Sequence, residues 1–106
     1  MKAKHIQVIT TISSRTEAEK IAKALIDKKL AACVQIAGPI KSIYRWKGRI
    51  ETAREWVCVI KAKSRLYKKI ETAIKELHPY EVPEIIATPI MLANKDYLKW
   101  IKSNSV

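Results

Sequence analysis

The order of the apolar segments predicts an α+β fold. Segments with strand and helix character alternate as β-α-β-β-α-β, and a short amphipathic segment follows at the end. The two middle strands are long and meet at a tight turn, which favours an antiparallel sheet. With 106 residues, of which 48% are hydrophobic, the chain is expected to be one domain over residues 1–106. These observations predict a ferredoxin-like sandwich, with a long central hairpin and a short C-terminal helix.

The first two elements are a strand and an amphipathic helix. Residues 6–12 are rich in β-branched side chains, which favour a strand. Ser14 and Glu17 have the spacing of a capping box, in which each side chain bonds a free backbone N–H of the other residue. A helix is therefore predicted from this cap to residues 28–29. Its apolar positions recur at i, i+3, i+4 and i+7: Ala18, Ile21, Ala22 and Leu25.

A long β-hairpin occupies the middle of the chain. One strand covers 32–36, is interrupted at Gly38-Pro39 and continues over 40–46, and the other runs over 49–63. Lys47-Gly48 is the predicted turn, because glycine tolerates a positive φ. Arms of roughly 15 residues exceed the usual strand of about 5–6 residues, so the hairpin should extend beyond the core. We expect another subunit to cover its aromatic side chains, which are Tyr44, Trp46 and Trp56.

The second half contains a helix, a strand and a final helix. Ser64 is the predicted N-cap of the second helix of the chain. This helix ends at His78, because a residue before proline disfavours the α conformation. A short strand over 84–88 lies between two prolines, which mark either a sheet edge or the ends of the strand. Asn94 is the predicted cap of the terminal helix.

Composition excludes several classes of protein. The net charge is +11, but the basic residues are spread along the chain and form no stripe with interleaved aromatics, so nucleic acid is not an expected partner. No apolar run approaches the ~20 residues that span a bilayer, so no membrane association is expected. Two cysteines are too few for a disulfide-rich secreted domain, and we expect a cytoplasmic location.

Cys33 and Cys58 are expected to be free thiols. With Lys47-Gly48 as the turn, Cys33 faces Ala62 and Cys58 faces Ala37 across the hairpin. The two cysteines then share a face but lie four positions apart, about 13 Å at ~3.3 Å per residue. A disulfide needs Cα atoms within ~7 Å. Cys58 lies in an apolar run and should be buried, whereas Cys33 should be more open.

Residues 78–84 form the densest group of chemically active side chains. A histidine, a tyrosine and two glutamates lie on a loop stiffened by two prolines, which suits a binding loop. Alternatively, His78 and Glu81 only end the helix and solvate a turn, and the residues themselves favour neither interpretation. The two histidines are far apart in sequence, and no metal motif, phosphate-binding glycine loop or catalytic assembly is recognisable. An enzyme is not expected.

Four segments together resemble the CutA divalent-cation-tolerance proteins, in the order in which that family carries them. They are residues 30–34, 42–50, 76–85 and 96–101, and the resemblance covers about residues 6–101. It implies a ferredoxin-like subunit in a homotrimer, with hairpins that extend the sheet onto neighbouring subunits. It also implies a role in tolerance of copper and other divalent cations, without an established enzyme activity.

The resemblance places a candidate polar cleft on six residues: Cys33, Trp46, Glu51, His78, Tyr80 and Glu81. His78 and Cys33 are the implied metal ligands, since an imidazole and a thiolate suit copper. Thr10-Thr11 stand where some members carry a cysteine, and Leu77 replaces one histidine of a pair.

Two functions are therefore predicted. The first is a non-enzymatic homotrimer of divalent-cation tolerance that binds copper weakly at or near His78, with copper as the only cofactor. The alternative is a sensor similar to the PII signalling trimers, which binds an anionic small molecule in a cleft between subunits. The +11 charge favours the alternative.

Overall fold

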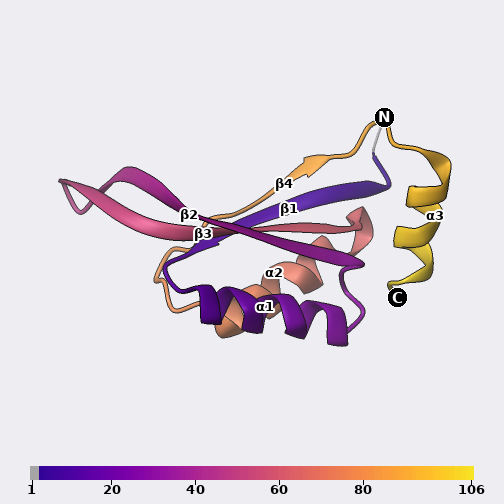
Figure 1. The fold of residues 1–106 in the computed structure, drawn as a ribbon, viewed down its shortest axis with the longest axis horizontal. Helices are drawn as coiled ribbons and strands as arrows, with labels where there is room; N and C mark the ends of the chain where they lie inside the picture. Colours follow the sequence, from indigo (N-terminus) through magenta and orange to yellow (C-terminus); the bar gives the residue numbers. More distant parts are fainter. Residues whose placement is uncertain (1–2) are drawn as a thin grey trace.

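The computed structural model describes residues 3–106 and confirms the ferredoxin-like fold. A four-stranded antiparallel sheet has the strand order β2-β3-β1-β4, and two helices cover one of its faces (Figure 1). The strands are β1 (His5–Ile12), β2 (Cys33–Trp46), β3 (Arg49–Lys63) and β4 (Ile85–Pro89). The helices are α1 (Arg15–Asp27), the 3-10 turn η1 (Ser64–Leu66), α2 (Tyr67–Leu77) and α3 (Lys95–Ser103). None of the helices over 3–106 has the length and apolar character needed to cross a membrane.

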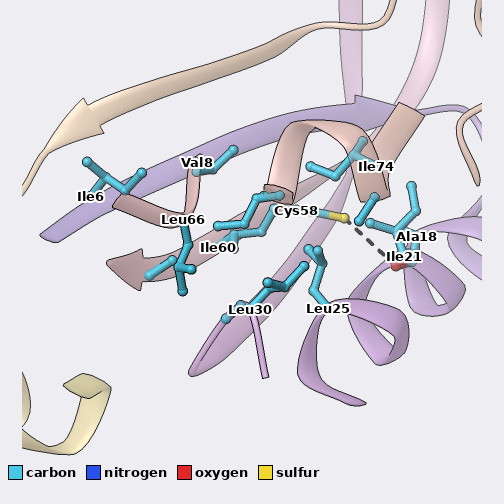
Figure 2. Packing of buried hydrophobic residues seen from close by; sticks show 14 of the residues in the cluster. Ile6, Val8, Ala18, Ile21, Leu25, Leu30, Cys58, Ile60, Leu66 and Ile74 are labelled. Atoms are coloured by element: carbon cyan, nitrogen blue, oxygen red, sulfur yellow. Dashed lines mark hydrogen bonds between the residues drawn. The ribbon is translucent and has the colours of Figure 1, made fainter. Parts of the chain in front are cut away.

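The core lies between the two central strands and the helices α1 and α2. Alternate residues of β1 and β3 point towards the helices, and the apolar stripe of each helix points back (Figure 2). Burying one such isoleucine or leucine side chain stabilises the fold by about 1.5–3 kcal/mol. The fully buried side chains include Val8, Ile12, Ile21, Leu25, Cys58, Ile60, Ile70 and Ile74.

Two of the three predicted helix caps are confirmed. The Ser14 hydroxyl accepts the backbone N–H of Glu17 at 3.2 Å, and the Asn94 side chain accepts that of Tyr97 at 2.7 Å. Helix α2 ends at Leu77, as the following proline requires.

The prediction that Ser64 caps the second helix is wrong. Ser64 opens the 3-10 turn instead, and its hydroxyl donates to the Ala3 carbonyl at 2.6 Å. The hydroxyl therefore ties the chain before β1 to the end of β3, and α2 begins without a side-chain cap.

Replacing Thr10 with valine should stabilise the protein. Thr10 is fully buried, and its hydroxyl has no hydrogen-bond partner within the described chain. Removing an unpaired buried hydroxyl of the same shape should raise the free energy of unfolding by about 1 kcal/mol. Calorimetry should then show a melting temperature higher by roughly 4 °C. Thr11→Val is the matched control, because the Thr11 hydroxyl donates to Glu84 at 3.4 Å and its loss should not stabilise.

The hairpin turns at the predicted residues and extends beyond the core. Lys47 and Gly48 have φ values of 50° and 79°, the left-handed conformation of a two-residue hairpin turn. Pairing runs from Trp46–Arg49 back to Ile40–Glu55 as expected. Strand β1 pairs with β3 only from Trp56 onwards, so residues 40–55 project without a neighbouring strand (Figure 1).

A bulge divides the hairpin into two halves. Gly38 and Pro39 together lie opposite Trp56, and the register shifts by one residue between Ala37 and Ile40. A Cβ on Gly38 would lie 2.7 Å from Cε3 of Trp56, so the close packing of the indole requires glycine.

Because of the bulge, the predicted pairing of the two cysteines across the hairpin is wrong by one residue. Cys33 faces Lys61 rather than Ala62, and Cys58 faces Ile36 rather than Ala37. Because a slip of one residue moves side chains to the other face, the two cysteines lie on opposite faces of the sheet. Both are free thiols, as predicted, and burial raises the pKa of the Cys58 thiol to about 11.

Candidate functional site

A pocket of about 720 Å³ lies where β1 ends and the hairpin continues alone. Three segments enclose it: the end of β1 with the residue after it, the projecting part of the hairpin, and the loop after α2. This pocket is referred to below as the hairpin pocket. Its lining consists of Thr11, Ser13, Ser42, Ile43, Tyr44, Trp46, Ala53, Glu55, Tyr80, Glu81, Val82 and Glu84.

The hairpin supplies side chains to the pocket through strand alternation. Ser42, Tyr44 and Trp46 are spaced by two residues, so they point to one side of β2. Ala53 pairs with Ser42 and therefore lies on the same side, as does Glu55 two residues further along β3. The alternation gives this side of the hairpin hydroxyl, aromatic and carboxylate groups.

His78 fixes the loop after α2 to the end of β1. Its side chain is buried, and Nε2 lies 2.8 Å from the carbonyl oxygen of Thr11. A carbonyl only accepts, so Nε2 donates and carries the proton. Nδ1 accepts the backbone N–H of Tyr80 at 3.2 Å, and the two rings pack edge to face at 4.6 Å. Both ring nitrogens are therefore used within the protomer.

Tyr80 in turn holds a buried carboxylate. Its hydroxyl donates to Oε2 of Glu55 at 2.7 Å, and Glu55 is only 5% exposed. Burial raises the pKa of Tyr80 to about 12, and the hydrogen bond to Glu55 adds to the increase. The phenol consequently keeps its proton at neutral pH and remains a donor to the carboxylate.

Comparison with known proteins identifies the family. The family model "CutA1 divalent ion tolerance protein" matches residues 6–104. The divalent-cation tolerance protein CutA of Thermus thermophilus is 42% identical over 98 residues, which cover 92% of this chain and 95% of that protein. The chain belongs to the CutA1 divalent ion tolerance family.

Solved CutA1 structures have the same fold. The crystal structure of CutA1 from Shewanella sp. SIB1 is 44% identical, with a TM-score of 0.96 over 99% of this chain and 98% of that chain. The structure described as the periplasmic divalent cation tolerance protein CutA from Archaeoglobus fulgidus is 42% identical, with a TM-score of 0.92, covering 94% and 97%. The ferredoxin-like architecture is thus that of solved CutA1 proteins.

In this CutA1 chain, only some of the residues predicted for the polar cleft lie together at the hairpin pocket. Trp46, Tyr80 and Glu81 line it, and His78 supports its loop from behind. Glu51 pairs with Tyr44 in the hairpin but is not part of the lining.

Cys33 lies elsewhere in the protomer. It pairs with Lys61, whereas Thr11, the hydrogen-bond partner of His78, pairs with Val57. This difference of four residues along β3 corresponds to about 13 Å. Cys33 and His78 are consequently too far apart to bind one ion within a protomer.

The aromatic residues predicted for a subunit interface have two different environments. Tyr44 and Trp46 are 44% and 37% exposed on the projecting hairpin. Trp56 differs from the expectation, because it packs against the core of its own protomer and over Gly38. It pairs with Ile12, where β1 still accompanies β3.

One protomer does not fit a copper site built from His78 and Cys33. Both nitrogens of His78 have partners, and Cys33 is distant. Over residues 3–106, no three side chains of His, Cys, Asp or Glu are grouped so that they could hold a metal ion. Further donors would have to come from another copy of the chain.

Glu55 is the charged residue of the pocket that sequence reasoning missed, and the hydroxyls of Ser13 and Ser42 were missed as well. Glu55 follows Arg54 directly and stands in the polar part of β3 that precedes the apolar run 56–60, so it resembles any exposed strand residue. Its hydrogen-bond partner Tyr80 lies 25 positions later in the chain. No local pattern in the sequence marks Glu55 as a buried residue.

Proposed function

We propose that this CutA1 chain is a non-enzymatic homotrimer that binds copper weakly near His78, at a cleft between copies. The observation that carries the proposal is the hairpin pocket beside His78, which contains three carboxylates and neither lysine nor arginine. Carboxylate oxygens attract divalent cations but are poorer copper ligands than imidazole or thiolate, so binding should be weak. Of the three pocket carboxylates, Glu81 and Glu84 are the nearest to His78 in sequence.

The uncovered face of the sheet supports assembly into a homotrimer. Helices α1 and α2 cover only one face of the sheet (Figure 1). The other face carries apolar side chains that are partly exposed. A contiguous apolar surface of this kind is typical of an interface between subunits. Together with the projecting hairpin, it suits a closed ring in which each copy covers the next. The apolar residues of this face are Ile9, Val57, Val59 and Ile86.

Copper titration tests the proposed site. In calorimetry of metal-free protein with copper(II) sulfate, we expect weak binding that is reduced about tenfold or more in Glu81→Gln and in His78→Ala, a loss of roughly 1.4 kcal/mol. His5→Ala is the matched control, because His5 lies at the far end of β1 and should not affect binding. Copper affinity unchanged in both pocket variants would overturn the site.

The alternative function, a sensor of an anionic small molecule similar to PII trimers, receives less support. The lining of the pocket contains no basic side chain, so a neighbouring copy would have to neutralise the anion. The +11 charge still favours an anionic ligand over long distances. ATP binding stronger than copper binding in the same calorimeter would favour this alternative.

A cytoplasmic location remains our proposal from the sequence. Names of relatives refer to other compartments: the Archaeoglobus fulgidus structure is described as periplasmic, and the rice protein CutA 1 as chloroplastic. Fractionation of cells that express the chain would test the location directly.

A further inference from the structure

The hairpin pocket contains a buried carboxylate without a cationic partner among the described residues. Glu55 is 5% exposed, and the phenol of Tyr80 is the group that bonds it. The ion pairs formed over residues 3–106 join other side chains, all of them on helices or their ends. A buried carboxylate is stable when a cation compensates its charge. We therefore expect a positively charged group from outside the protomer to pair with Glu55.

The charge of the whole lining points in the same direction. The chain has 21 lysines and arginines, yet none of those in residues 3–106 lines the pocket. The charged residues that do line it are Glu55, Glu81 and Glu84. The pocket is therefore a locally acidic cavity in a basic protein, and a cavity of one sign concentrates ligands of the opposite sign.

The aromatic side chains and the size of the pocket indicate an organic cation. Tyr44, Trp46 and Tyr80 contribute rings, and ring faces attract ammonium and guanidinium groups. The Lys47 ammonium already lies 5.7 Å from the centre of the Trp46 ring, so this ring accepts a cation. A volume of about 720 Å³ suits a small organic molecule rather than a bare metal ion.

We propose that the hairpin pocket binds a small organic cation, an amine or guanidine joined to an apolar or aromatic group, with Glu55 as its counter-ion. Tyr80 holds one oxygen of Glu55 and leaves the carboxylate oriented for the ligand. The hydroxyls of Ser13 and Ser42 supply further acceptors for N–H groups, and the rings enclose the apolar part. The inference rests on this pocket and does not require copper to bind there.

A matched series of ligands tests the sign of the charge. Benzylamine, benzyl alcohol and benzoate have nearly the same shape and are cationic, neutral and anionic at pH 7. In calorimetry on the assembled protein, benzylamine should bind at least about tenfold more tightly than benzyl alcohol, and benzoate should not bind. Equal affinity for benzylamine and benzyl alcohol would overturn the proposal.

A pair of variants tests the role of Glu55. Glu55→Gln should reduce the affinity for benzylamine to that for benzyl alcohol, whereas Glu76→Gln, on the surface of α2, should leave it unchanged. If Glu55→Gln does not fold, Tyr80→Phe keeps the charge but releases the carboxylate, and should weaken benzylamine binding while preserving the preference for the cation. An unchanged affinity of Glu55→Gln for benzylamine would contradict the role of Glu55 as the counter-ion. If Glu55→Gln does not fold, an unchanged affinity of Tyr80→Phe would contradict it instead.

The experiment also separates this inference from the proposed copper site. Benzylamine binding without copper binding refutes the copper proposal alone, and copper binding without benzylamine binding refutes this inference alone. Absence of benzylamine binding would mean that the charge of Glu55 attracts no ligand into the pocket of the assembled protein. That result would overturn the proposal.

Discussion

Gly38→Ala should lower the free energy of unfolding by about 3 kcal/mol, the upper end of the cost of overpacking a well-packed site. The added methyl would lie 2.7 Å from Cε3 and 3.0 Å from Cδ2 of Trp56, closer than carbon atoms approach. The indole packs against the core, so it has little room to move away. Gly38 also has a φ of 156°, a conformation that L side chains rarely adopt.

Gly48→Ala is the control for Gly38→Ala. Gly48 has a φ of 79°, but nothing lies within 4 Å of an added Cβ. Its replacement should cost only about 1 kcal/mol, the penalty of a left-handed backbone. Urea unfolding of both variants at one protein concentration gives the comparison. If both replacements lowered the free energy of unfolding equally, packing against Trp56 would not be the reason why Gly38 must be glycine.

If the chain forms the trimer proposed above, Trp46→Ala should dissociate it at protein concentrations at which the parent chain remains assembled. Fully burying a side chain of this size contributes roughly 1.5–3 kcal/mol, and a threefold assembly contains each contact three times. Removing the side chain thus reduces the free energy of association more than the free energy of folding of one copy. Light scattering should detect a smaller mass, and the melting temperature should depend more steeply on concentration than in the parent protein.

Trp100→Ala provides the matched control for Trp46→Ala. Trp100 is 44% exposed on α3, close to the 37% of Trp46, and it stacks on Tyr97 of its own helix. We expect this variant to remain trimeric. A Trp46→Ala protein that stays trimeric at nanomolar concentration, with an unchanged melting temperature, would assign Trp46 to the pocket alone.

The fold was predictable because its signals are local. The apolar spacing of α1, the caps at Ser14 and Asn94, and the Lys47-Gly48 turn each depend on a few adjacent residues, and all are confirmed. The bulge was not predictable in detail. The interruption at Gly38-Pro39 was visible, but its one-residue shift results from the packing of Trp56, which only the folded sheet determines.

The site was less predictable because its contacts join distant parts of the chain. Residues 78–84 were recognisable as a polar loop. The sequence did not indicate that His78 turns inwards and bonds the carbonyl of Thr11, 67 positions earlier. Glu55 carried no local signal, since a glutamate in a hairpin is ordinarily exposed, whereas this one is buried and bonds Tyr80. Partners separated by tens of residues leave no pattern in a single sequence.

The strand pairing also restricts how this hairpin can change length during evolution. Removing two residues from each strand on the tip side preserves both pairing and facing, so such paired deletions are compatible with the same subunit. Removing Gly38 or Pro39 alone would remove the bulge, but Ala37 would still lie opposite Val57 and Ile40 opposite Glu55. Residues 33–37 would keep their facing, so Val34 and Ile36 would remain packed against the core. Homologues should therefore vary in hairpin length by multiples of four residues, apart from the single extra residue of the bulge.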